Sequence, residues 1–232
     1  MIFIQPSINP VLLSLGFIDI RWYSLAYIFA FIFGSILIKK LNRKSYKLLS
    51  NIQIDRFFIW AVIGVIIGGR IGYVLFYQTN LFFSDPLYMF EIWKGGMSFH
   101  GGLIGMIFSI YFFSRRHKIQ FFYLSDLVSL VAPIGLFLGR ISNFINTELY
   151  GRVTDFHIAI IYPLIDNNPR HPSQLYEALF EGLILFTILF FYFLRKPKKY
   201  FFGKISALFL IFYSIFRFLI EYLREPDYHL GL

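Results

Sequence analysis

The sequence contains no cysteine and little charge: only 15% of its 232 residues are Asp, Glu, Lys or Arg. The absence of cysteine excludes disulfides, thiolate metal sites and a cysteine nucleophile supplied by the chain itself. Hydrophobic residues make up 57% of the chain and aromatic residues 22%. A soluble domain of this length has too small an interior for so much apolar surface. The composition therefore predicts a polytopic helical membrane protein.

Several familiar catalytic motifs are absent as well. The histidines show no metal-ligand spacing such as His-x3-His. There is no Gly-x-Ser-x-Gly sequence, which marks a serine nucleophile, and no Walker-type phosphate loop. These absences argue against a metalloprotease, an intramembrane serine protease and an ATP-driven machine. We therefore expect neither a bound metal ion nor a cofactor.

Six apolar segments are each long enough to cross the hydrocarbon core of a bilayer. They predict an all-α fold with transmembrane helices at about 21–38, 57–77, 97–114, 122–140, 174–194 and 204–223. We expect one membrane-embedded domain that covers residues 1–232, with an extracytoplasmic segment at about 141–173.

Most of the 22 basic residues follow the first, third and fifth predicted spans. They are Lys39, Lys40, Arg43, Lys44, Lys47, Arg56, Arg115, Arg116, Lys118, Arg195, Lys196, Lys198, Lys199 and Lys204. The positive-inside rule therefore predicts cytoplasmic connections there and an extracytoplasmic N-terminus. Because the net charge of +9 is concentrated in these membrane-flanking clusters, we do not expect nucleic-acid binding.

The polar residues inside the predicted spans gather on one side of the membrane. Arg70, Arg140 and Arg217 all lie in the outward halves of their spans, given a helical rise of about 1.5 Å per residue. His100 and Tyr23 stand at the outward beginnings of the third and first spans. Scattered snorkelling residues would instead divide between both sides. The pattern predicts a site on the extracytoplasmic side.

Arg140 lies in the most informative string of the chain, Gly139–Gly151, which also holds Asn143 and Glu148. A permanent cation at membrane depth is costly unless an anion or polar partner compensates it. A phospholipid phosphate is the obvious anion at that depth, and arginine can bind it bidentately. The string therefore predicts a phosphate-binding site at Arg140.

His100 lies within a glycine-rich segment, Gly95–Gly102. The glycines allow either a close approach of the backbone to a ligand or close packing of membrane helices. A neutral imidazole can act as a general base near neutral pH. His100 is therefore a candidate catalytic base.

Two further groups of charged residues follow helical spacing. Tyr213, Arg217, Glu221 and Arg224 share one helix face, which indicates either an intrahelical Arg–Glu pair or a surplus of positive charge that binds an anion. Glu177 and Glu181 lie four residues apart in the fifth span. Because intramembrane carboxylates normally pair, we expect them to partner Arg70 or another buried cation.

These motifs together resemble the bacterial phosphatidylglycerol–prolipoprotein diacylglyceryl transferase family over nearly the whole chain. The resemblance rests on Arg21–Tyr23, Gly68–Tyr73, Gly95–Gly102, Gly139–Gly151, His171–Glu177 and Arg217–Asp227. The Gly139–Gly151 string is similar to the family signature, except that Ser142 stands where the family has a smaller residue. The family also has seven spans, so we expect the seventh to be absent from this chain.

The resemblance implies an enzyme of the bacterial inner membrane, with its active site on the extracytoplasmic side. Its substrates would be phosphatidylglycerol and preprolipoproteins, its products a thioether-linked lipid and glycerol 1-phosphate. It implies catalytic roles for His100, Arg140 and Arg217. The expected phosphatidylglycerol-binding residues are Tyr23, Arg140, Asn143, Glu148, Gly151, Tyr213, Glu221 and Arg224.

Two other classes of protein would use the same arginines. A lipid or anionic-solute transporter needs polar residues along the cytoplasmic halves of its spans, and the sequence has few there. A non-catalytic lipid-binding membrane protein needs only the anion site. Thiol-dependent release of glycerol phosphate separates the enzyme from both.

Overall fold

The computed structural model describes residues 3–16, 19–44, 46–195 and 202–226. The chain divides into two compact units, one formed by residues 1–37 and 126–232 and the other by residues 38–125. Among the residues discussed above, Lys196, Lys198, Lys199 and Asp227 lie outside the described ranges.

Helices occupy all six ranges in which spans are predicted. Five of them are α1 (Trp22–Lys44), α2 (Asn51–Tyr77), α4 (Phe99–His117), α5 (Phe121–Ile145) and α8 (Lys204–Glu221). The fifth predicted span is a continuous helical run made of α6 (Ser173–Glu177), the π-helical segment η3 (Ala178–Ile184) and α7 (Leu185–Arg195). Within the described part of the chain, α1, α2, α5 and the run Ser173–Arg195 are long and apolar enough to cross a membrane. These helices make the chain a multi-pass membrane protein, and crossing by α4 and α8 stays a prediction.

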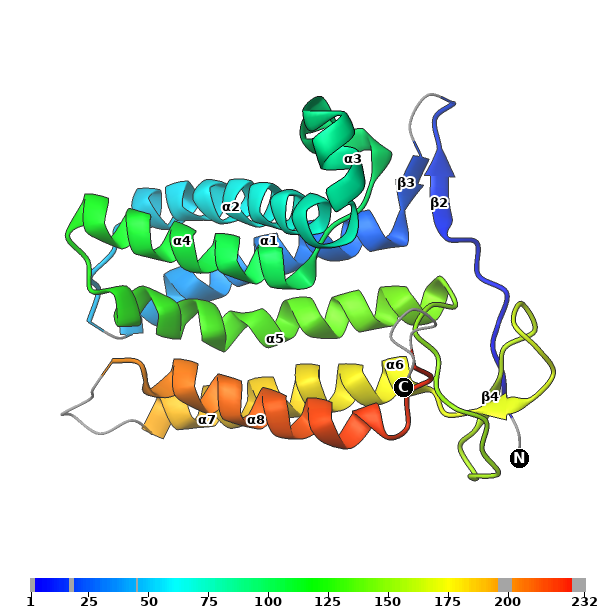
Figure 1. Ribbon diagram of the computed structural model, residues 1–232. Coiled ribbons are helices and arrows are strands. Elements are labelled where there is room, and N and C mark those ends of the chain that lie inside the picture. Colours follow the sequence, from blue (N-terminus) through cyan, green and yellow to red (C-terminus); the bar gives the residue numbers. More distant parts are fainter. Residues whose placement is uncertain (1–2, 17–18, 45, 196–201, 227–232) are drawn as a thin grey trace. The chain divides into compact units, whose positions relative to one another are not determined.

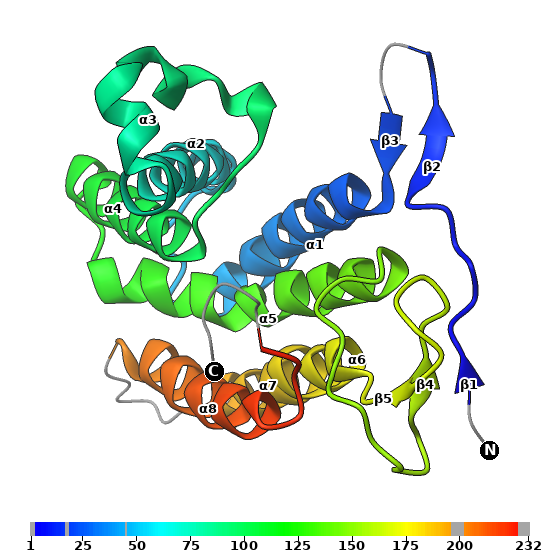
Figure 2. The ribbon, with the colours of Figure 1, turned by 45° about the vertical axis from the view of Figure 1, so that its right-hand side comes forward.

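In the unit of residues 38–125, α2 and α4 pack along each other (Figure 2). The α2 helix begins with a capping box, in which Ser50 and Gln53 bond each other's backbone N–H groups. A Cβ atom on Gly101 in α4 would lie 2.2 Å from the carbonyl oxygen of Gly68 in α2. Close helix packing, one of the two expected roles of the glycines, is therefore confirmed for Gly101.

Between α2 and α4 the chain forms α3 (Thr79–Ser84) and two short 3₁₀ turns, η1 (Pro86–Phe90) and η2 (Ile92–Lys94). Arg70 is buried and donates hydrogen bonds to backbone carbonyl oxygens of this segment. Its Nη2 lies 2.7 Å from the carbonyl oxygen of Tyr88, and its Nε lies 3.2 Å from the carbonyl oxygen of Met89. Its Nη1 also donates a hydrogen bond to the carbonyl oxygen of Gly95. Arg70 thus has carbonyl acceptors that compensate its burial.

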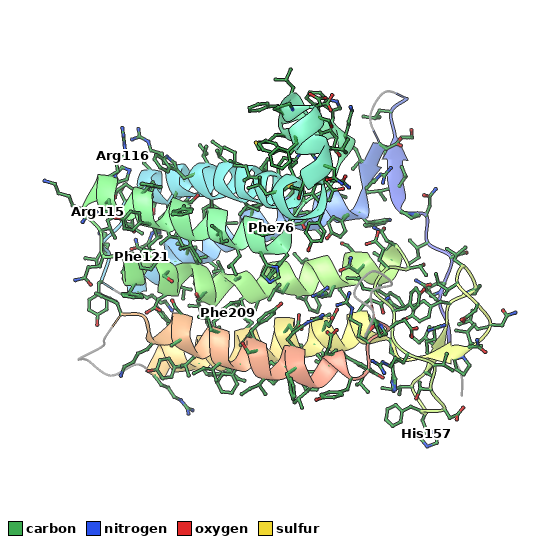
Figure 3. All side chains as sticks on the ribbon, viewed as in Figure 1. Phe76, Arg115, Arg116, Phe121, His157 and Phe209 are labelled. Carbon is green, nitrogen blue, oxygen red and sulfur yellow. The ribbon has the colours of Figure 1, made fainter. Side chains whose placement is uncertain are left out.

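Basic residues end α4 as the charge pattern predicts. Arg115 and Arg116 are exposed and extend away from the last turn of the helix (Figure 3). Cations at a helix C-terminus are favoured by the helix dipole.

Short strands in the other unit depart from the expected all-α fold. β1 (Phe3–Ile4) pairs in parallel with β4 (Ile160–Ile161), which pairs antiparallel with β5 (Pro169–Arg170). β2 (Val11–Ser14) and β3 (Asp19–Arg21) form an antiparallel hairpin before α1. Strands of two to four residues are too short to show an alternating pattern in the sequence. The fold is therefore mostly helical rather than all-α.

In the same unit, the helical run from α6 to α7 lies beside α8 (Figure 1). The carboxylate of buried Asp126, on α5, accepts hydrogen bonds from the backbone N–H groups of Gly203 and Ser206, at 2.9 and 2.8 Å. Because the first N–H groups of a helix have no partner within it, Asp126 stabilises the start of α8. It thereby fixes the helix that carries Arg217.

Candidate functional site

Arg140, near the end of α5, faces two buried carboxylates on a neighbouring helix. Its Nε lies 3.2 Å from Oε2 of Glu177, and its Nη2 lies 3.5 Å from Oε2 of Glu181. Both carboxylate side chains are 0% exposed. The expectation that Glu177 and Glu181 pair with a buried cation is therefore confirmed, and that cation is Arg140.

Arg217 approaches the same carboxylate from α8. Its Nη1 donates a hydrogen bond to Oε1 of Glu177, and its Nη2 lies 2.6 Å from Oε2 of Glu221. Nη1 of Arg224 lies 3.9 Å from the same Glu221 oxygen. We call Arg140, Glu177, Glu181, Arg217, Glu221 and Arg224 the ion-pair cluster.

The formal charges of the ion-pair cluster balance. The intrahelical pair between Arg217 and Glu221 is confirmed, but the predicted surplus of positive charge along α8 is wrong. The reason is that Glu177, which comes from another helix, supplies a carboxylate that spacing along α8 cannot reveal. Three guanidiniums and three carboxylates share the cluster.

The ion pairs of Arg140 leave it able to bind an anion. Among the described residues, Oε2 of Glu177 and both carboxylate oxygens of Glu181 have no hydrogen-bond partner, so Arg140 contacts them without completing hydrogen bonds. Its side chain is 18% exposed. A guanidinium carries five N–H donors in a planar fork. Arg140 therefore keeps donors for an oxyanion while the carboxylates compensate its charge.

Two amides orient the carboxylate of Glu148 just beyond α5. Nδ2 of buried Asn143 donates to Oε2 of Glu148 at 2.9 Å, and Nδ2 of Asn146 donates to Oε1 at 3.2 Å. Asn143 stands three residues after Arg140, so both lie on one face of the helix. The exposed Glu148 carboxylate and Arg140 thus present a polar edge at one helix end.

Gly151 joins the segment after α5 to the end of α8. Its N–H donates to the carbonyl oxygen of His171 at 2.9 Å, and it forms an isolated β-bridge with Arg224. A Cβ atom there would lie 2.4 Å from the carbonyl oxygen of His171 and 2.6 Å from that of Leu223. Only glycine fits between these backbones, so Gly151 fixes the position of Arg224.

Tyrosines of this unit complete the candidate residues. The Tyr27 hydroxyl donates to that of Tyr23 at 3.4 Å on α1, and Tyr27 interacts electrostatically with Arg140. Tyr213, one turn before Arg217 on α8, interacts electrostatically with Glu181 and Arg140. These hydroxyl groups belong to the surroundings of the ion-pair cluster.

Comparison with known proteins gives a match over nearly the whole chain. The family described as prolipoprotein diacylglyceryl transferase matches residues 10–232. The chain belongs to this family. Its relatives include three proteins named phosphatidylglycerol–prolipoprotein diacylglyceryl transferase. That of Pseudoalteromonas atlantica is 49% identical over 231 residues, or 99% of this chain and 80% of the relative.

The other two relatives come from different bacteria. The Rickettsia bellii protein is 48% identical over 226 residues, which cover 97% of this chain and 86% of the relative. The Vibrio vulnificus protein is 47% identical over 227 residues, which cover 98% of this chain and 83% of the relative. The prolipoprotein diacylglyceryl transferase resemblance drawn from the motifs is therefore confirmed.

His100 of this chain lies near the start of α4, in the unit of residues 38–125. Its side chain is exposed, and its ring centroid lies 5.5 Å from that of Phe99. The ion-pair cluster belongs to the other unit. The role of His100 as a base stays a prediction.

The sequence did not reveal a second group of ion pairs, which surrounds Arg170. Arg170 pairs with Asp166 at 2.6 Å and Glu225 at 3.3 Å, and its guanidinium lies 5.0 Å from the Tyr150 ring centroid. The neighbouring guanidinium of Arg170 lowers the pKa of the Asp166 carboxyl to about 2. The i, i+4 spacing of Asp166 and Arg170 was the available signal, although it suggested no link to Glu225.

Proposed function

We propose that this protein transfers the diacylglyceryl group of phosphatidylglycerol to the lipobox cysteine thiol of a preprolipoprotein. A thioether forms and glycerol 1-phosphate leaves. Family membership and the names of the relatives support this activity. The structural observation that carries it is the placement of Arg140 and Arg217 on one buried carboxylate, Glu177. Two fixed guanidiniums suit one phosphate group.

The reaction places specific demands on these side chains. The sulfur attacks the glyceryl carbon while the bond from that carbon to the phosphate oxygen breaks. The bonding electrons leave with the phosphate, which becomes a monoester and gains negative charge. Guanidiniums held in place before the reaction stabilise that charge as it develops. The thiol must also lose its proton, because the thiolate is the reactive nucleophile.

Each candidate residue receives a role in this proposal. Arg140 holds the phosphate of the lipid, and Asn143 with Glu148 orients its glycerol headgroup. Arg217 stabilises the departing phosphate, and His100 deprotonates or orients the thiol. The remaining candidates line the lipid site: Tyr23, Gly151, Tyr213, Glu221 and Arg224.

The proposed location is the bacterial inner membrane with the site facing outward. Basic residues in the last turns of α1 and α4, such as Lys44 and Arg116, lie at the helix ends that the positive-inside rule assigns to the cytoplasm. Arg140 and Arg217 lie toward the opposite ends of α5 and α8 from the basic connections. This arrangement supports an extracytoplasmic N-terminus and six spans.

The test is an assay with purified protein in vesicles that contain phosphatidylglycerol labelled in its headgroup glycerol. We expect labelled glycerol phosphate to be released with a lipobox peptide that bears cysteine, and not with the matched serine peptide. Movement of intact lipid between leaflets without release would favour a transporter. Lipid binding without either would favour a non-catalytic lipid-binding protein.

A further inference from the structure

Glu181 is the least stabilised carboxylate of the ion-pair cluster. It is 0% exposed, and its nearest cationic atom is Nη2 of Arg140, 3.5 Å away. Among the described residues neither of its oxygens has a hydrogen-bond partner. Glu177, by contrast, lies between two guanidiniums, and Glu221 is 53% exposed and 2.6 Å from Arg217. A buried carboxylate without hydrogen bonds is the one whose charge costs most.

The local fold keeps Glu181 in this position. It belongs to the π-helical segment η3, a departure from α-helix that often accompanies functional sites. A Cβ atom on the adjacent Gly182 would lie 2.9 Å from Cα of Phe137 on α5. This close contact between the two backbones holds Glu181 against the helix that carries Arg140.

The charged and titratable groups around Glu181 come from three elements. Arg140 faces it from α5, Glu177 from its own helix, and Arg217 with Tyr213 from α8. Because the guanidiniums and carboxylates of the cluster balance, a phosphate that binds there adds unbalanced negative charge. Glu181 would then repel the ligand and compete with it for Arg140.

We propose that Glu181 takes up a proton when an anionic phosphate group binds at Arg140 and Arg217, and releases that proton when the phosphate leaves. Protonation removes the negative charge that competes with the phosphate for the Arg140 guanidinium. Glu181 is thus a positioning residue that sets the anion affinity of Arg140. The identity of the anion as a lipid phosphate rests on the proposed function.

Uptake of a proton by Glu181 on binding makes the affinity for the anion depend on pH. Binding that requires uptake of one proton weakens as pH rises, by up to ~tenfold per pH unit where free Glu181 is ionised and bound Glu181 is protonated. In a Glu181→Gln variant the side chain has no proton to take up. Its affinity should be independent of pH over the same interval and at least equal to the strongest wild-type binding.

The experiment measures binding of short-chain phosphatidylglycerol and, separately, of dimethyl phosphate, a phosphodiester that does not titrate in this range, to the purified full chain between pH 6 and pH 8.5. Proton uptake on binding is followed with an indicator dye in weak buffer. The variants are Glu181→Gln and the control Asp155→Asn, which removes an exposed carboxylate outside the ion-pair cluster. We expect the wild type and Asp155→Asn to lose affinity as pH rises, and Glu181→Gln to lose none.

Wild-type binding without proton uptake overturns the proposal and requires no variant. A Glu181→Gln protein with the wild-type pH dependence overturns it as well. Proton-linked binding of dimethyl phosphate but not of phosphatidylglycerol overturns the assignment of the anion to a lipid. Thiol-dependent glycerol phosphate release, measured on the same wild-type sample, tests the proposed function separately. Its absence beside proton-linked binding contradicts the transferase proposal and supports the role of Glu181.

Discussion

Arg217 on α8 donates a hydrogen bond to Glu177 on α6, although the two residues are 40 positions apart in the sequence. The other oxygen of the Glu177 carboxylate faces Arg140 at 3.2 Å. A buried anion between two guanidiniums compensates part of the charge of each and fixes their separation. This relationship combines cations from two helices into one candidate phosphate site.

The Glu177→Gln variant should unfold at a clearly lower temperature than the wild type. Removal of one partner from a buried ion pair leaves uncompensated charge and costs on the order of 3 kcal/mol. The measurement is thermal unfolding of the purified protein in detergent.

Glu221→Gln is the matched control, because that carboxylate also pairs with Arg217 but is 53% exposed. Its cost should stay below about 1 kcal/mol. Equal decreases in unfolding temperature for the two variants would show that burial of Glu177 adds nothing to its contribution to stability.

The Gly151→Ala variant should lose both stability and activity. Its new Cβ atom would lie 2.4 Å from the carbonyl oxygen of His171, an approach that the backbone must relieve by moving apart. Gly139→Ala is the control within the same string, since nothing lies within 4 Å of a Cβ atom there. In a helix that substitution stabilises by up to about 1 kcal/mol. Comparable losses in both variants would contradict the packing argument.

The Asp166–Arg170 pair should make stability fall in acid. The pKa of Asp166 is lowered to about 2 in the folded protein by Arg170, against about 3.9 when unfolded. The pair therefore contributes fully above about pH 4, and its contribution is lost as pH falls toward 2. Asp166→Asn should lower stability at pH 7 and reduce its decline between pH 4 and pH 2. A variant with the wild-type decline would exclude Asp166 as its source.

His100→Gln should reduce turnover by about 10²–10⁴-fold, the usual contribution of a general base. The control is His157→Gln, because His157 is exposed on the loop between α5 and α6 (Figure 3). Full activity of the His100 variant in the vesicle assay would remove this residue from the chemistry.

The helices could be predicted from the sequence, but their ends could not. Apolar runs mark the thickness of the bilayer, whereas α1 continues through basic residues to Lys44 and α2 begins at Asn51, after the Ser50 cap. The short strands gave no signal, because their pairing depends on loops that only the folded chain brings together.

The residues of the candidate site could be predicted from the sequence, but their contacts could not. The cost of charge at membrane depth identified Arg140, Arg217 and the two carboxylates from sequence alone. Which cation meets which carboxylate depends on helix packing, which no spacing along a single helix contains. This is why the sequence indicated surplus charge on α8, whereas Glu177 compensates it.

The most direct test of the phosphate site is turnover of Arg140 variants that are correctly inserted in membranes. We predict that Arg140→Gln lowers thiol-dependent glycerol phosphate release at least ~100-fold, the effect of removing a donor aimed at developing charge. Arg140→Lys should also be strongly impaired, because an ammonium group cannot bind phosphate bidentately. Arg116→Gln, at the exposed end of α4, should retain activity. Near-wild-type release by Arg140→Gln would contradict the account.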